Sequence, residues 1–272
     1  MRNVILLCIT IILLFPLYWM FIGSLQPIMG ILAMPPRFIP KQVDFMNYAT
    51  ILLKNPIFLW IGNSLFILLT SVFLSICIIS MAGYALSIYQ FPGKTLIFWL
   101  FITSMMFPRT IMIIPLFVLM RTIGLADNRL GAVLPLLHYP FGILLFKTFC
   151  DGIPREMIDS GRIDGASELR IIFSIAIPIC KPIIGALILF QSLFSLGDYL
   201  WQMLILQKPQ IQTLLIGLVA SIMRRGADST MNVNPIGMQL AAGVVLFLPL
   251  LIIFIFTSRY FVKDIKLGGI KE

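Results

Sequence analysis

Six long apolar runs dominate the hydrophobic pattern of the chain, and shorter polar or proline-rich stretches separate them. A helix needs about 20 apolar residues to cross the hydrocarbon core of a bilayer, where only helices or closed barrels satisfy the backbone hydrogen bonds. Because the runs are long and apolar throughout, they predict an all-α integral membrane fold with six transmembrane helices in a single domain, residues 1–272. The predicted spans are Val4 to Ile22, Ile61 to Leu86, Thr95 to Met120, Leu130 to Phe149, Pro182 to Leu206 and Ile236 to Ser258.

The composition also excludes an ordinary soluble domain. The chain is 60% hydrophobic and 11% charged, with a mean hydropathy of +1.02. Its net charge of +9 could indicate nucleic-acid binding, but the basic residues are scattered over loops instead of forming one stripe. We expect them to anchor the chain at the membrane interface, with no nucleic-acid partner. Arg2 before the first run is typical of a signal peptide, yet no A-x-A cleavage site follows Ile22, so we expect a retained helix.

The even number of predicted spans places both termini on one side of the membrane. An excess of Lys and Arg in loops should identify the cytoplasmic side. That excess is small here, so the orientation depends on the charged loop described below. The proline-rich stretch Gly23 to Trp60 is expected to be an external loop. The polar stretch Gln207 to Pro235, with Arg224-Arg225-Gly226, Asn232 and Asn234, is expected to be another, or else a solvated connector.

Few residues could carry out chemistry. The cysteines lack C-x-x-C spacing, and the single histidine, His138, has no second histidine or acidic partner, so we expect no metal site. Gly93-Lys94-Thr95 resembles the end of a phosphate-binding loop, but Ile88 stands where that motif needs a glycine. An intramembrane enzyme would need a nucleophile with a base, which we do not find. The sequence therefore predicts no catalytic residue and no cofactor bound by this chain. The cysteines are Cys8, Cys77, Cys150 and Cys180.

Charged residues gather in one loop, Lys147 to Lys181. Pro154 suits the first position of a helix, and Glu156 then faces the positive end of the helix dipole. Gly161 and Gly165 weaken that helix, which predicts a bend. The basic and acidic residues of the loop are Lys147, Arg155, Arg162, Arg170, Lys181, Asp151, Glu156, Asp159, Asp164 and Glu168.

A second short helix should follow the bend. Ser167 can cap it, and it should run into Ile175 and stop near Pro178. The loop contains too many apolar residues for a free solvated segment, so we expect part of its surface to dock on a partner. The alternative is a helical hairpin on the lipid headgroups, although its balanced charge lacks the Lys/Arg excess of such helices. The apolar positions are Met157, Ile158, Ile163, Ala166 and Leu169.

This loop resembles the coupling motif of permease subunits in binding-protein-dependent importers of the ATP-binding-cassette class. The motif reads E-A-A, three residues, G, nine residues, I-x-L-P. Here Asp159-Ser160-Gly161, Gly165 and Ile175-Ala176-Ile177-Pro178 stand at the same spacing, and Arg162 to Ser167 resembles the R-I-D-G-A-S of carbohydrate permeases. The departures are Asp159 for Glu, Ser160 and Gly161 for the two alanines, and Ile177 for Leu. Small residues are kept, although Gly161 should loosen the helix by about 1 kcal/mol relative to Ala.

The resemblance extends over nearly the whole chain and points to the shorter, six-span subunit of maltose-type permeases. It implies the type I importer permease fold, in the bacterial cytoplasmic (inner) membrane, with both termini cytoplasmic. The implied cargo is a sugar or sugar derivative, with glycerol phosphate as an alternative within the same group. The further fragments that carry the resemblance are Gly23 to Pro27, Asn63 to Leu65, Ala82 to Leu86, Phe91 to Gly93 and Arg259 to Lys263.

The resemblance also implies partners. The bent loop, residues 151–181, would be a cytoplasmic coupling helix in a cleft of an ATPase subunit, which hydrolyses the ATP. The assembly would contain two copies of the ATPase, a second permease subunit and an extracytoplasmic substrate-binding protein facing the stretch Gln207 to Pro235. The tail Val262 to Glu272 would either contact the ATPase pair or anchor the chain at the inner interface. The implied ATPase-coupling residues are Asp159, Ser160, Gly161, Arg162, Asp164, Gly165, Ala166 and Pro178.

Asp198 is the best candidate for a substrate pathway, because ionisable residues inside spans usually face a cavity. It lies beside Tyr199 and Trp201, where the family reads W-N-D-F-L-W, and the first Trp and the Asn are missing here. A carboxylate can accept hydrogen bonds from sugar hydroxyls while an aromatic ring covers the apolar sugar face. Helix packing or gating is the alternative.

A secondary transporter would need intramembrane ion sites, for which only Asp198 and His138 are available.

Overall fold

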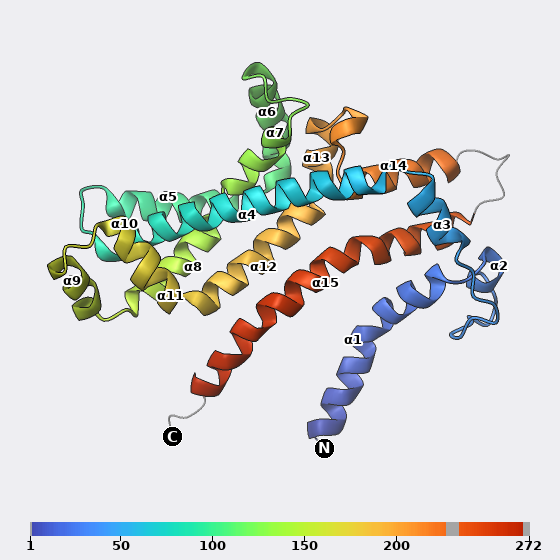
Figure 1. Cartoon of the computed structure of the whole chain (residues 1–272), viewed down its shortest axis with the longest axis horizontal. Helices are drawn as coiled ribbons and strands as arrows, with labels where there is room; N and C mark the ends of the chain where they lie inside the picture. The colour runs from blue at the N-terminus through green and yellow to red at the C-terminus, as the bar shows by residue number, and fades with distance from the viewer. Residues whose placement is uncertain (1, 227–233, 269–272) are drawn as a thin grey trace. The chain divides into compact units, whose positions relative to one another are not determined.

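The computed structural model describes the backbone of residues 2–226 and 234–268, and the side chains of residues 3–224 and 234–258. The described chain is helical and contains no strand (Figure 1). Asn232 and the end of the predicted tail therefore lie outside the described residues, as do the side chains of Arg225 and of the fragment Arg259 to Lys263. The fold class predicted from the apolar runs, all-α, is confirmed.

The chain forms two compact units. The first comprises Met1–Asn63 and Pro209–Leu251, and the second Ser64–Lys208 and Ile252–Glu272. The prediction of a single permease domain over residues 1–272 stays a prediction. The elements that begin in the first unit are α1 (Arg2–Ser24), α2 (Ile28–Ile31), α3 (Met46–Leu53), α4 (Ile57–Ile88), η3 (Pro209–Ile211), α14 (Leu214–Gly226) and α15 (Pro235–Gly268). Those of the second are α5 (Lys94–Met106), α6 (Arg109–Thr122), α7 (Arg129–Val133), η1 (Leu134–Leu137), α8 (Pro140–Asp151), α9 (Arg155–Ile163), α10 (Glu168–Ile171), η2 (Ile172–Ala176), α11 (Ile177–Ile179), α12 (Lys181–Gly197) and α13 (Tyr199–Ile205).

Three described helices, α1, α4 and α15, are long and apolar enough to cross a membrane alone. Three bent pairs pass the same test when each pair is taken together, which gives up to six spans, the number that the apolar runs predict. The third pair differs from the predicted fifth span, because it includes residues 168–179 of the predicted loop and leaves out α13. The pairs are α5 with α6, bent by 103°, the helical stretch Arg129–Leu137 with α8, bent by 47°, and the stretch Glu168–Ile179 with α12, bent by 89°.

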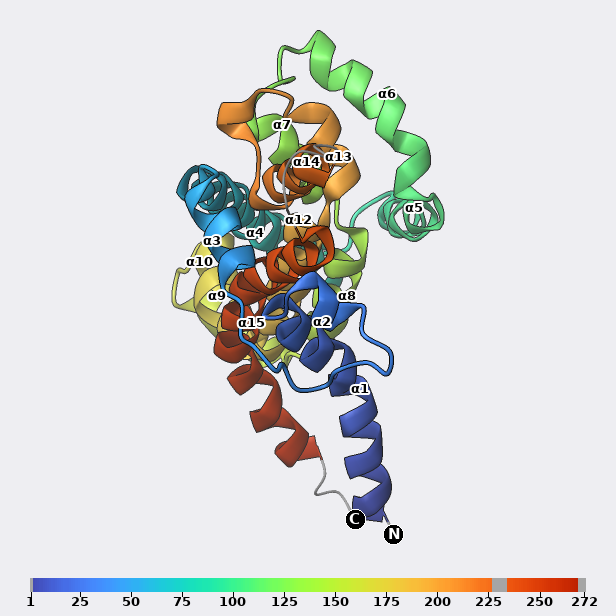
Figure 2. The same ribbon diagram turned by 90° about the vertical axis from the view of Figure 1, so that its right-hand side faces the viewer.

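Three predicted spans are not continuous helices. The run Leu130 to Phe149 breaks at His138 and Tyr139, between η1 and α8. The run Thr95 to Met120 breaks at Phe107 and Pro108, and Figure 2 shows α6 leaving α5 at a sharp elbow. Pro108 lacks an N–H and forces the residue before it out of the helical region, which ends α5. The run Pro182 to Leu206 breaks at Asp198, whose backbone is not helical and whose carboxylate caps α13.

The first unit has its own apolar core. Ile51 of α3 and the start of α4 pack with α14 and with Met238 and Ala241 of α15. The stretch Gln207 to Pro235 was expected to be a polar external loop, and this expectation was wrong for residues 214–226, which form helix α14. Leu214, Leu218 and Ile222 recur at every fourth position and form the buried face of the amphipathic helix α14.

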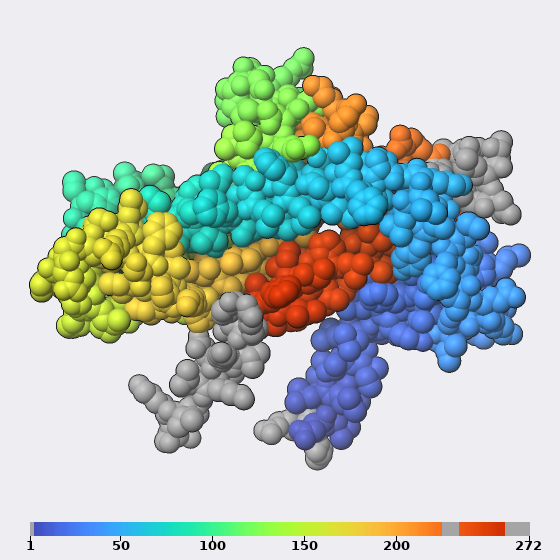
Figure 3. Space-filling model, viewed as in Figure 1, coloured from blue at the N-terminus to red at the C-terminus, as the bar shows by residue number. Residues whose placement is uncertain are grey.

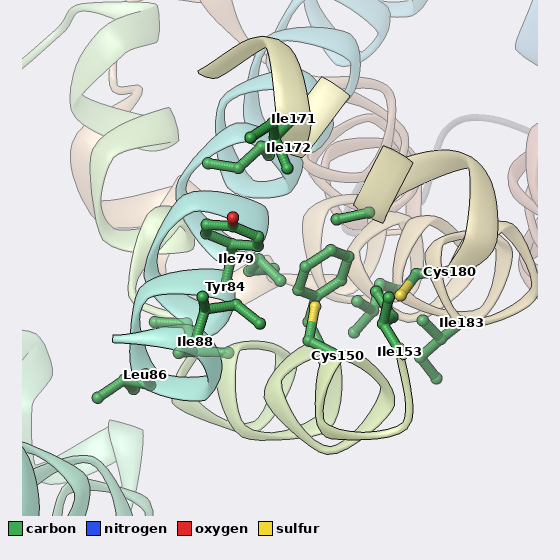
Figure 4. Close-up of a cluster of buried hydrophobic side chains, with 14 of the residues drawn as sticks. Ile79, Tyr84, Leu86, Ile88, Cys150, Ile153, Ile171, Ile172, Cys180 and Ile183 are labelled. Atoms are coloured by element: carbon green, nitrogen blue, oxygen red, sulfur yellow. The ribbon is translucent and has the colours of Figure 1, made fainter. Parts of the chain in front are cut away.

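The second unit holds the larger core around the C-terminal part of α4. There α4 and α8 approach closely at Gly83, where a Cβ atom would lie only 2.9 Å from the carbonyl oxygen of Ile143. Side chains from α4, α8, α10 and η2 converge on Tyr84 and Cys150 (Figure 4). Cys150 and Cys180 are both buried in this core. Ile158, Ile171 and Ile172 of the charged loop also belong to this core.

Candidate functional site

The charged loop folds as a helix, a bend and a second helix, which confirms the prediction. Helix α9 begins at Arg155, one residue later than predicted, so Pro154 is its N-cap; Glu156 lies in the first turn. Gly165 has φ of +75° and ends the helix in a left-handed turn. The N–H of Ala166 donates to the carbonyl of Gly161, and that of Gly165 to the carbonyl of Arg162, each at 3.0 Å. These two bonds define a Schellman motif.

The second arm begins at Ser167, as predicted. Its hydroxyl accepts a hydrogen bond from the N–H of Arg170 at 3.4 Å. Helix α10, the π-helical segment η2 and α11 continue to Ile179, with Pro178 exposed in the last of them. The chain then turns by 89° into α12. We call residues 151–181 the coupling segment from here on.

One face of the coupling segment is anchored in the core of the second unit. Ile158 of α9 is only 1% exposed, and Ile171 and Ile172 are buried beside it. Gly161 faces the second arm, because a Cβ atom there would lie 3.0 Å from Cδ1 of Ile175. A glycine at this position therefore brings the two arms together. Ala166 is half-buried against the same core.

Polar contacts attach the coupling segment to the end of α4. The Tyr84 hydroxyl donates to Glu168 at 2.8 Å, and Glu168 also accepts from Nε of Arg162 at 2.8 Å. Arg162 further pairs with Asp159 at 3.1 Å. Its hydrogen bond with the Glu168 carboxylate raises the pKa of Arg162 above its usual range. The guanidinium therefore stays charged and bridges the two arms of the bend.

A second set of contacts lies at the C-terminal end of α4, where helix carbonyls lack partners within the helix. Arg155 donates to the carbonyls of Ser87 and Ile88, each at 3.3 Å. The Ser87 hydroxyl donates to Asp151, which also pairs with Lys147, both at 2.7 Å. Sequence reasoning missed the roles of Tyr84, Ser87, Arg155 and Glu168. Their types gave no signal, since Tyr84 lies 84 positions from Glu168, Ser87 lies 64 positions from Asp151, and Arg155 lies 67 positions from Ile88.

The other face of the coupling segment is exposed (Figure 3). Ile163, at the tip of α9, is 86% exposed, and Met157 and Leu169 are also exposed. Among the residues predicted to contact an ATPase, Gly161 is buried and Ala166 half-buried, so these two serve packing within the chain. The exposed ones are Asp159, Ser160, Arg162, Asp164, Gly165 and Pro178.

The predicted substrate-pathway residues form the junction between α12 and α13. Asp198 is half-buried and accepts a hydrogen bond from the N–H of Trp201 at 3.4 Å. The Trp201 side chain is 3% exposed, and its indole N–H donates to the carbonyl of Gly131 at 3.2 Å. Tyr199 is half-buried. Trp201 therefore has a packing role in this chain, and contact of the three residues with cargo stays a prediction.

Among the residues with described positions, no three His, Cys, Asp or Glu side chains come together as a metal site requires. His138 is exposed and follows η1, at the break between η1 and α8. The predicted absence of a metal and of a cofactor stays a prediction.

Known proteins resemble this chain in sequence, and a solved structure resembles it in fold. The chain is 35% identical over 266 residues to the arabinooligosaccharides transport system permease protein AraQ of Bacillus subtilis, covering 97% of this chain and 92% of that protein. It is 32% identical to the maltodextrin transport system permease protein MdxG of Bacillus subtilis, with coverages of 85% and 84%. It is 27% identical to the sn-glycerol-3-phosphate transport system permease protein UgpE of Brucella abortus, with coverages of 97% and 94%.

A solved structure has the same fold. It belongs to a bacterial ABC transporter involved in the import of the acidic polysaccharide alginate, with a TM-score of 0.81, 24% identity, and coverage of 96% of this chain and 95% of that one. Residues 76–267 match the family described as the binding-protein-dependent transport system inner membrane component. Its members are multi-pass membrane permeases, not enzymes, and they work with an ATPase and a substrate-binding protein. The chain belongs to this family of importer permeases.

Proposed function

We propose that this permease subunit passes a sugar, and specifically an oligosaccharide, across the bacterial cytoplasmic membrane. The names of the relatives support this cargo. The relatives with 35% and 32% identity are named for arabinooligosaccharides and for maltodextrin, and both of these are oligosaccharides. The relative named for glycerol 3-phosphate shares only 27%. Glycerol phosphate is therefore the second candidate cargo. Asp198 and Tyr199 are the side chains that we assign to the pathway, with Trp201 positioning them.

The coupling segment is proposed to be the contact with the ATPase. The observation that carries this is its two-sided construction, with Ile158 anchored in the core and Ile163 exposed on the same helix. A helix held by its own chain on one face and by a motor protein on the other transmits rigid-body motion. Asp159, Ser160, Asp164 and Gly165 lie on the exposed part. Arg162 holds the bend, while Gly161, Ala166 and Pro178 shape the two arms.

The remaining proposals concern the assembly. Two ATPase copies would drive this subunit and a second permease subunit of similar fold, and ATP would be hydrolysed only by the ATPase, with no cofactor on this chain. Because ATP is on the inside of the cell, the coupling segment and both termini would be cytoplasmic. The stretches 23–60 and 207–235 would then face the binding protein outside. The tail Val262 to Glu272 would reach the ATPase pair or anchor the chain.

Two measurements test these proposals. Uptake of labelled oligosaccharides should stop when cells are depleted of ATP and continue when a proton uncoupler is added; the opposite pattern would favour an ion-coupled carrier. Ile163→Cys, in a chain with Cys8→Ser and Cys77→Ser, should react with a membrane-impermeant maleimide only in inside-out vesicles, because the two remaining cysteines, Cys150 and Cys180, are buried. Labelling in right-side-out vesicles would overturn the orientation.

A further inference from the structure

Two of the broken spans meet in the second unit. The pair of α5 and α6 breaks at Pro108, and Arg109 is the first residue of α6. The predicted span Pro182 to Leu206 breaks at Asp198, and α13, which follows this break, lies beside α6. Non-helical backbone at membrane depth is tolerated where it is buried in protein or lines a water-filled cavity. Broken helices form the cargo sites of many secondary transporters, so the meeting point of these two breaks is a candidate cargo site.

Arg109 lies against the ring of Phe194, which stands near the end of α12. The central carbon of its guanidinium is 5.7 Å from the ring centroid, within the roughly 6 Å of a cation–π contact. Phe194 precedes Asp198 by four residues, so the ring and the carboxylate lie on the same side of α12. The charge of Arg109 also acts on the carboxylate of Asp198. A cation, an anion and an aromatic ring are thus brought together from two separate spans.

The polar groups of this cluster are not used up within the chain. Among the described residues, Arg109 forms no salt bridge with Asp198, and none accepts a hydrogen bond from its guanidinium. Asp198 uses Oδ1 for the N–H of Trp201, and no described residue donates to its Oδ2. Phe194 is 44% exposed, and Arg109 beside it is exposed. The cluster therefore offers donors, an acceptor and part of an aromatic ring to a ligand.

A neutral sugar matches this set of groups. A hydroxyl both donates and accepts hydrogen bonds, so one sugar hydroxyl can bridge a carboxylate and a guanidinium that do not touch each other. The exposed part of the Phe194 ring can cover the apolar face of the sugar. The charges of Arg109 and Asp198 cancel, so a neutral sugar leaves no charge unbalanced. An acidic sugar would place a second negative charge beside Asp198, which is unfavourable.

We infer that Arg109, Phe194 and Asp198 form a subsite for a neutral sugar unit of the cargo, and that the balance between Arg109 and Asp198 determines the preference for neutral over acidic sugars. The inference rests on the proposed function, because it requires the cargo to be an oligosaccharide. Without the charge of Asp198, the guanidinium would be free to bind a sugar carboxylate through two parallel hydrogen bonds. The alternative is that Arg109 extends its charged group to the membrane interface without touching cargo.

The test measures direct binding of sugars to the complete importer in nanodiscs, without binding protein, by saturation-transfer NMR. The neutral probes are maltotriose and arabinotriose, and the acidic probe is digalacturonate. Arg109→Gln should weaken binding of the neutral probes by about tenfold or more, the scale of a lost hydrogen bond to a charged group. Phe194→Leu should weaken it by about fivefold. Arg121→Gln is the matched control, because Arg121 is an exposed cation in the last turn of α6. Its affinity should stay within about twofold of wild type.

Asp198→Asn tests the charge balance itself. Asparagine keeps Oδ1 and can still cap α13, but it removes the negative charge that balances Arg109. Binding of digalacturonate should therefore become about tenfold tighter than in wild type, as expected for a new charge-assisted hydrogen bond. The double variant Asp198→Asn with Arg109→Gln should lose this gain, because the guanidinium that binds the carboxylate is then absent.

The inference is overturned if Arg109→Gln binds the neutral probes like wild type, if Arg121→Gln weakens binding equally, or if Asp198→Asn gains no affinity for digalacturonate. It is also overturned if the wild-type importer takes up an oligosaccharide with its binding protein but binds neither neutral probe in the nanodisc; the proposed function would then stand without the subsite. If the wild-type importer with its binding protein takes up no oligosaccharide, or takes up glycerol 3-phosphate instead, the proposed cargo fails and the subsite fails with it.

Discussion

Two isoleucines on α9, Ile158 and Ile163, lie on opposite faces of the coupling segment, so substituting each one tests the contacts of one face. Ile163 is 86% exposed in this chain, so Ile163→Ala should leave the fold of the permease intact. If the ATPase covers this side chain, the loss of three carbons at about 0.8 kcal/mol per buried methylene costs about 2 kcal/mol. That energy corresponds to roughly a 30-fold weaker association with the ATPase.

Ile158→Ala is the matched substitution on the opposite face. Because Ile158 is 1% exposed within its own chain, its truncation leaves a cavity under α9 and should cost about 2 to 5 kcal/mol of stability. The permease should unfold at a lower temperature and lose protection of residues 155–179 against protease. Its direct contact with the ATPase would be unchanged.

The assay is the affinity of purified ATPase for the permease pair in nanodiscs, together with thermal unfolding of the permease alone. Ile163→Ala should change only the first quantity, and Ile158→Ala should change the second. The reasoning is refuted if Ile163→Ala binds the ATPase as tightly as wild type, or if it unfolds as early as Ile158→Ala. Either result would mean that the exposed tip of α9 is not the partner's contact.

Three other substitutions test separate features. Gly165→Asp puts a side chain at φ of +75°, which costs about 1 to 2 kcal/mol; we expect ATP hydrolysis without uptake at normal abundance, and normal uptake would contradict this. Gly83→Leu would place a Cβ atom 2.9 Å from the carbonyl oxygen of Ile143, so α4 and α8 must separate and the yield of folded protein in detergent should fall sharply. The control is Gly62→Leu at an exposed position of the same helix, where no atom lies within 4 Å of the added Cβ and the yield should stay normal. Trp201→Phe removes the hydrogen bond to Gly131 and should lower stability by about 1 kcal/mol, while the preference among sugars stays as in wild type; a changed preference would place Trp201 in contact with cargo.

Local signals predicted the coupling segment well. The left-handed turn at Gly165 and the cap at Ser167 depend on residues within four positions, so the sequence contains everything that forms them. The six apolar runs are similarly local, since the length and hydropathy of a run decide whether it can span a bilayer. The break at Pro108 also has a local cause, since proline ends the helix before it.

Long-range pairings could not be predicted. Nothing near Glu168 indicates that it binds Tyr84, which lies 84 positions earlier. Trp201 is an aromatic residue of the kind that could cover a sugar face. Its indole N–H nevertheless donates to the carbonyl of Gly131, which lies 70 positions away. The buried face of α14 was overlooked because the polar residues around it suggested a loop. In each case packing between distant segments decides the outcome, and one sequence does not contain that information directly.

Several charges of the coupling segment are paired within the chain, and this affects how the segment meets a partner. Lys147, Arg162 and their three carboxylate partners pair within the chain, and Arg155 is used by the carbonyls of α4. These paired charges add little attraction for a partner of either sign, and the apolar side chain of Ile163 lies exposed at the tip of α9. Salt screens exposed charges over about 10 Å at 0.1 M. Raising the salt concentration should therefore hardly weaken the binding of the ATPase, because that binding would come from shape complementarity and buried apolar surface.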